Sequence, residues 1–113
     1  MTRYQTRIKE SEDRIAEELT AKIKRIAGNY NMPYAYFFSS PSQKASVLRV
    51  RNAIVYILRI DYSIPYRIIG QIFGGTTHSS LIKGFKKFEF FLEHEEESKE
   101  IYNYCYKIIC EDK

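Results

Sequence analysis

The sequence has no tryptophan and only two cysteines, three prolines and five glycines among its 113 residues. So few prolines and glycines, together with 44% apolar residues, exclude a disordered or low-complexity chain. Cys105 and Cys110 stand five residues apart, a spacing that fits neither a CxxC redox pair nor half of a zinc site. We therefore expect two partly buried free thiols and no metal site.

Long apolar runs are also missing. No stretch approaches the ~20 apolar residues that a membrane span needs. The polar start MTRYQTRIKESEDR lacks the apolar segment of a secretory signal. The length suits one hydrophobic core and is too short for two. We expect a single stand-alone domain over residues 1–113 with its core at about 11–110, no membrane partner and a cytoplasmic location.

Patterns that support catalysis are absent as well. No Ser/His/Asp or Cys/His arrangement converges, and no pair of carboxylates stands in an apolar setting. The phosphate-binding pattern G-x-x-x-x-G-K-[ST] does not occur in the sequence. We therefore expect no enzyme, no cofactor and no bound nucleotide.

Positive charge is concentrated in the middle of the chain. The net charge of +4 divides into +2 for residues 1–39, +6 for residues 40–90 and −4 for residues 91–113. A basic middle segment favours a face that binds a polyanion. Charged faces are more often simply solvated, so charge alone does not identify nucleic acid as the partner.

Apolar residues recur at helical spacing, and no segment is typical of a strand. The expected helices are Ser11–Ala27 with Ser11 as N-cap, a short aromatic turn at 33–38, and helices over about 43–61 (capped by Ser42), 65–73, 78–92 and 95–109. The expected inward residues are Ile15, Leu19, Ile23, Ile26, Val47, Ala53, Ile54, Ile57, Leu58, Leu81, Phe85, Phe88, Leu92, Ile101, Tyr104 or Cys105, Ile108 and Ile109. The fold class is therefore all-α, a compact bundle of about five to six helices.

Two of these helices are joined by a glycine pair. Gly74 and Gly75 end the first, and either Thr76 or Thr77 can cap the second. Short polar residues open the second helix, and its Lys83 lies opposite the expected core side. This is the helix-turn-helix pattern, in which short residues at the start of the second helix let its backbone approach the base edges of the major groove.

The segment IGQIFGGTTHSSLIKGFKKFE resembles the signature of the C-terminal DNA-binding domain of the bacterial replication initiator DnaA. That signature reads I-G-x-x-F-G-G-R-D-H-T-T-V. The matching positions are Ile69, Gly70, Phe73, Gly74, Gly75, His78, Ser79, Ser80 and Leu81. Upstream, the stretch from Arg51 to Arg59 resembles the family's P-R-Q-x-A-M-Y-L-x-[RK], and the spacing from Arg51 to His78 needs no gap.

The resemblance implies double-stranded DNA as partner, with about residues 77–92 as recognition helix, in replication initiation or its regulation. Other replication proteins are then further candidate partners, and the nucleoid of a bacterial or phage system is the place of action. By resemblance, His78, Ser79 and Ser80 contact base edges, and Arg49 and Arg51 lie at the minor groove. Arg59, Lys83, Tyr66 and Arg67 approach the DNA backbone. The implied DNA-binding residues also include Thr76 and Thr77 at the start of the recognition helix and Lys86 on its cationic side.

The sequence departs from the family at the start of the recognition helix. Thr76 and Thr77 replace Arg-Asp, and Thr77 can still cap the helix but cannot accept from a cytosine amine as a carboxylate would. Val50 replaces the usual proline. These departures leave open a second hypothesis, in which the same fold is a protein-interaction module that regulates a replication or transcription factor. Steeply salt-dependent affinity for duplex DNA would distinguish DNA binding from that alternative.

Overall fold

The computed structural model describes residues 3–38 and 45–110, and the side chains from residue 11 onward within these ranges. The elements are α1 (Arg3–Asn29), the 3-10 helix η1 (Tyr34–Phe37), α2 (Ala45–Ile60), α3 (Tyr66–Ile72), α4 (His78–His94) and α5 (Glu96–Ile109). Every regular element within the described ranges is a helix, which confirms the expected all-α bundle.

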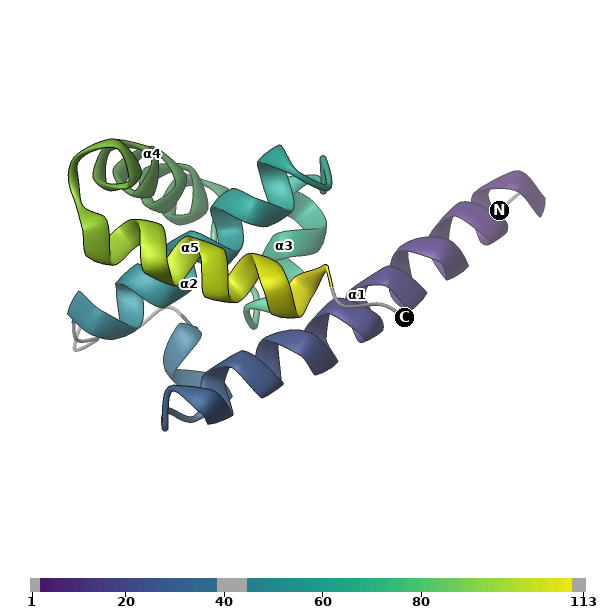
Figure 1. The fold of residues 1–113 in the computed structure, drawn as a ribbon. Helices are drawn as coiled ribbons and strands as arrows, with labels where there is room; N and C mark the ends of the chain where they lie inside the picture. Colours follow the sequence, from purple (N-terminus) through teal and green to yellow (C-terminus); the bar gives the residue numbers. More distant parts are fainter. Residues whose placement is uncertain (1–2, 39–44, 111–113) are drawn as a thin grey trace.

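Helix α2 occupies the centre of the bundle. It packs against α4 and α5 and also touches η1 and α3 (Figure 1). Nine residues of this helix, between Val47 and Leu58, are buried. This central position accounts for the mostly apolar, β-branched sequence of the helix. Helix α1 packs against α3, α5 and η1, and its N-terminal end extends well beyond the other helices (Figure 1).

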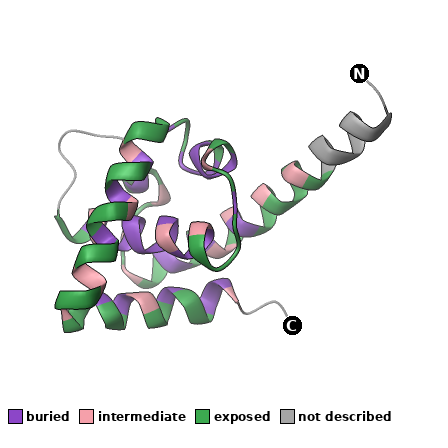
Figure 2. Ribbon diagram, turned by 90° about the horizontal axis from the view of Figure 1, so that it is seen from above, coloured by how far each residue is buried: buried purple, intermediate pink, exposed green. Residues whose placement is uncertain are grey.

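One apolar cluster joins all the helices. In Figure 2 the buried parts of the ribbons face the interior of the bundle, and the exposed parts lie on its outer sides. Most expected inward residues belong to this cluster. Leu81 and Phe88 of α4 are fully buried, whereas Phe85 and Leu92 are half-buried and pack against the cluster. Of the pair on α5, Cys105 points inward and Tyr104 is exposed.

The start of α1 differs from expectation. Ser11 does not cap a helix, because α1 already begins at Arg3. The preceding residues, RYQTRIKE, contain neither glycine nor proline, so nothing interrupts the helix upstream of Ser11. Ile15 was expected inward but is 38% exposed, because at this point α1 turns Glu12, Ala16 and Leu19 toward the bundle instead. The expected cap Ser42 lies outside the described residues.

The two cysteines agree with the sequence-based expectation of free thiols. Both thiols are free, with Cys105 buried and Cys110 half-buried. Burial raises the pKa of the Cys105 thiol to about 12. Among the described helices, none is long and apolar enough to cross a membrane.

Candidate nucleic-acid interface

The turn between α3 and α4 depends on its two glycines. Gly74 and Gly75 have φ angles of 68° and 88°, in the left-handed region. The amide of Gly75 donates to the carbonyl of Gly70 at 2.7 Å, and the amide of Gly74 donates to that of Gln71 at 3.2 Å. This pair of hydrogen bonds is the Schellman ending of a helix. A side chain at Gly74 would also meet the Phe38 ring, with Cβ 2.7 Å from Cδ2.

Of the two threonines after the turn, Thr77 is the cap. Its backbone is extended, with φ −68° and ψ 152°, and its hydroxyl accepts from the amide of Ser80 at 3.3 Å. Thr76 is buried, and its hydroxyl donates to the carbonyl of Phe73 at 2.8 Å. Thr76 therefore closes the turn, while Thr77 begins α4 and remains exposed.

The first turn of α4 faces outward. His78 and Ser79 are exposed, and Ser80 is half-buried. The His78 ring lies 6.3 Å from the Tyr66 ring, centroid to centroid. The Arg59 guanidinium lies 4.5 Å from the centroid of the same Tyr66 ring and donates to the carbonyl of Ile64 at 2.9 Å. The end of α2 and the start of α3 thus add a cation and an aromatic ring beside the start of α4.

Further along α4, the exposed face is cationic. Lys83 and Lys86 are exposed, and neither is bound to a carboxylate within the part of the chain that the structure describes. Ile82 is 36% exposed and lies one helical turn after Ser79 and one before Lys86. Ile82 was not among the DNA-binding residues predicted from the sequence. Its spacing of three from Ser79 was the signal that could have revealed it.

On its inner side, α4 brings Gly84 against the Arg51 and Asn52 side chains of α2. A Cβ atom on Gly84 would lie 2.3 Å from Oδ1 of Asn52 and 3.2 Å from Nη2 of Arg51, so a side chain at this position would displace the Asn52 amide. Arg51 is just 4% exposed. Its Nε donates to Oδ1 of Asn52 at 3.3 Å, and its Nη2 donates to the carbonyl of Ser80 at 3.5 Å. Burial lowers the pKa of the Arg51 guanidinium. In this arrangement Arg51 supports the first turn of α4 from behind.

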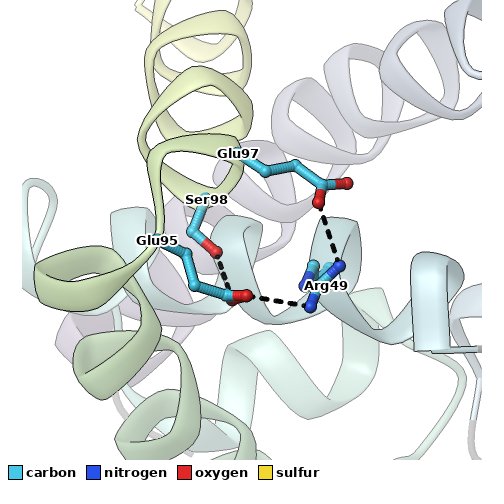
Figure 3. A network of polar contacts seen from close by, with 4 residues as sticks. All are labelled: Arg49, Glu95, Glu97 and Ser98. Atoms are coloured by element: carbon cyan, nitrogen blue, oxygen red, sulfur yellow. Dashed lines mark hydrogen bonds and ion pairs between the residues drawn. The ribbon is translucent and has the colours of Figure 1, made fainter.

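Arg49 is bound by carboxylates from the start of α5. Its guanidinium contacts Glu95 at 3.1 Å and Glu97 at 3.3 Å (Figure 3). Ser98, which is fully buried, donates to the other oxygen of Glu95 at 3.2 Å and fixes that carboxylate. The Arg49 guanidinium also lies 5.7 Å from the centroid of the Phe91 ring. Arg49 thus joins α2 to α5.

Arg67 is bound in the same way by α1. Its two terminal nitrogens donate to the two oxygens of Glu12 at 2.7 and 2.8 Å, a bidentate pair. These hydrogen bonds hold the pKa of the Glu12 carboxyl below its ordinary value and raise the pKa of Arg67. Both side chains reach solvent, so the contact is open to exchange with other anions.

The structure therefore separates the expected site residues into two groups. One surface, which we call the α4 face, gathers the exposed and half-buried residues: Arg59, Tyr66, Thr77, His78, Ser79, Ser80, Lys83 and Lys86. The remaining four are not free on it. Arg51 and Thr76 are buried, and Arg49 and Arg67 are held by carboxylates.

The chain is similar to the chromosomal replication initiator protein DnaA of Mycoplasma genitalium. The two are 28% identical over 79 residues, which make up 70% of this chain and 18% of that protein. The similarity supports a DnaA-like relationship. The chain thus matches less than a fifth of the length of its relative. No family model and no solved structure matches it.

Proposed function

We propose that the chain binds double-stranded DNA, with α3, the glycine turn and α4 acting as a helix-turn-helix. Helix α4 would then be the recognition helix in the major groove. The observation that carries this proposal is the exposed first turn of α4, whose short polar side chains are flanked by cations that no carboxylate neutralises within the described residues. A major groove about 12 Å wide admits one helix, and short side chains allow it to enter deeply.

The phosphate contacts in this proposal come from Arg59, Lys83 and Lys86. The N-terminus of α4 adds unpaired amides and the positive end of the helix dipole. Because phosphate neutralisation releases counterions, such a surface binds duplex DNA with an affinity that falls as salt rises.

The base contacts come from the exposed residues between these cations. His78 can donate or accept at a purine edge, depending on its tautomer, and the hydroxyl of Ser79 can do either. Ile82 adds an apolar side chain that suits the C5-methyl group of thymine. Thr77 can also contact a base, because its side chain is exposed at the N-cap of α4.

The four remaining residues take other roles in the proposal. Arg51 and Thr76 position the start of α4 through the carbonyls of Ser80 and Phe73. Arg49 and Arg67 become DNA contacts only when phosphate replaces the carboxylates that hold them.

The relative's name supports a biological setting for this activity. We propose a role in replication initiation or its regulation, at the nucleoid in the cytoplasm, with other replication proteins as further partners. Nothing in this role calls for catalysis or a cofactor.

Selection of bound sequences from a random duplex pool tests the proposal. We expect one sequence family to be enriched by the wild type and lost in a His78→Ala/Ser79→Ala variant. A Glu17→Gln/Glu18→Gln variant, changed on α1, should enrich the same family. If the wild type enriches nothing while remaining folded, DNA recognition is refuted and the protein-interaction alternative takes its place.

A further inference from the structure

A row of aromatic rings crosses the bundle outside the α4 face. Phe85 of α4 stacks on Tyr56 of α2 with ring centroids 5.2 Å apart. Tyr56 in turn meets Tyr102 of α5 at 5.9 Å, and Tyr102 stacks on Tyr106 at 5.7 Å. The first three residues are half-buried, and Tyr106 is 41% exposed. Three helices thus present a continuous aromatic surface, which we call the aromatic row.

Carboxylates surround this row. Asp61 accepts a hydrogen bond from the hydroxyl of Tyr102 at 3.0 Å. Glu89 and Glu93 lie one helical turn apart on α4, both exposed. Glu89 follows Phe85 by four residues on α4 and Glu93 follows Glu89 by four, so both carboxylates lie on the side of α4 that carries the row. Burial, followed by the charges of Glu89, Asp61 and Glu93, raises the pKa of Tyr56. Within residues 11–38 and 45–110, none of the three is bound in an ion pair.

We propose that the aromatic row, with Asp61, Glu89 and Glu93, is a docking surface for an arginine- or lysine-bearing segment of a protein partner. Aromatic ring faces attract guanidinium and ammonium groups, and carboxylates beside the rings strengthen that attraction. This surface goes beyond the proposed DNA binding and does not rest on it.

Charge complementarity selects this class of partner. Nucleic acid is repelled by three unpaired carboxylates, and an anionic membrane surface is repelled likewise. A cationic segment gains both the ring contacts and the ion pairs, which neither a purely apolar nor an acidic partner would gain. On α4, Glu89 and Glu93 follow Lys83 and Lys86 along the helix, so the carboxylates beside the row and the lysines of the α4 face occupy different stretches of it.

The test uses the full chain, labelled for nuclear magnetic resonance and titrated with a capped octa-arginine peptide in the absence of DNA. We expect saturable amide shifts concentrated near Tyr56, Phe85–Glu93 and Tyr102–Tyr106. A Glu89→Gln/Glu93→Gln variant should bind the peptide about fivefold to tenfold more weakly, as expected for the loss of two exposed charge contacts. Tyr106→Leu should also weaken peptide binding. A thermal unfolding transition close to that of the wild type would show that this variant keeps the fold.

The control is Glu96→Gln/Glu100→Gln on α5, which removes the same charge at the same four-residue spacing outside the row, although Glu96 also contacts Lys99 at 3.8 Å. It should leave the affinity nearly unchanged. An equal loss of peptide affinity in the two double variants, or amide shifts spread over all acidic positions, would show general charge attraction and overturn the proposal. Sedimentation of the chain without peptide adds a second check. Self-association that Glu89→Gln/Glu93→Gln abolishes would assign the surface to a second copy instead.

Discussion

The cations of the α4 face and the two arginines on its flanks have the same charge and very different surroundings. Lys83 and Lys86 project from α4 with no carboxylate bound to them among the described residues, whereas Arg49 and Arg67 are each held by glutamates of another helix. A free cation gains a phosphate at little cost, but a paired one must first release its carboxylate. The comparison shows that a cation's availability for phosphate is decided by whether a glutamate of α1 or from the start of α5 packs against it.

The largest expected effect concerns the packing of α4 on α2, which holds the α4 face in place. Phe88 holds α4 on α2 and is fully buried, so Phe88→Ala should lower the free energy of unfolding by about 3–5 kcal/mol. Phe85→Ala should cost clearly less, because its ring is half-buried. Urea unfolding of both variants measures the difference. A Phe85→Ala cost equal to that of Phe88→Ala would contradict the burial described for α4.

The next effect concerns base recognition at the open end of α4. Thr77→Asp supplies the carboxylate of the DnaA signature, and aspartate caps a helix as well as threonine does. We expect a sharpened preference for cytosine at one position by about 1–3 kcal/mol, with a slight loss of nonspecific affinity. Binding to duplexes that differ at single positions measures this. Unchanged preferences at every position would mean that the start of α4 does not contact bases.

The smallest effect concerns a paired arginine. Glu12→Gln removes the charge that neutralises Arg67, so duplex affinity should rise about threefold and the salt slope should steepen by up to one unit. Glu18→Gln, also on α1 and exposed, is the control and should change neither. A fall in affinity with Glu12→Gln would show that this pair holds α3 in a required position rather than masking a phosphate contact.

Much of the fold followed from local signals. The spacing of Leu81 and Phe88 placed the core side of α4, and Gly74-Gly75 placed the turn, because both signals act within a few residues. The prediction that α1 begins at Ser11 was wrong, because a good capping residue does not begin a helix when the residues before it also favour helix. Ile15 is exposed because α1 turns Glu12, Ala16 and Leu19 toward the bundle, and the apolar spacing alone did not reveal that this stripe begins with a glutamate.

The candidate site was predictable only in part. The exposed start of α4 followed from the turn and the polar residues after it. The burial of Arg51 did not, because it depends on Gly84 bringing α4 against α2, a contact 33 positions away in the chain. The partners of Arg49 and Arg67 lie 46 and 55 positions away, and no spacing rule relates residues so distant.

The most direct measurement is the salt dependence of duplex binding, followed by fluorescence anisotropy of a labelled duplex between about 50 and 200 mM salt. The account predicts steeply falling affinity for the wild type. In Lys83→Ala/Lys86→Ala the slope should be shallower by about two units, one for each phosphate contact removed. The control Lys99→Ala/Lys107→Ala, with the same charge change on α5, should keep the wild-type slope. Absence of salt-dependent duplex binding in the wild type, or an equal loss of slope in both variants, would contradict DNA binding through the α4 face.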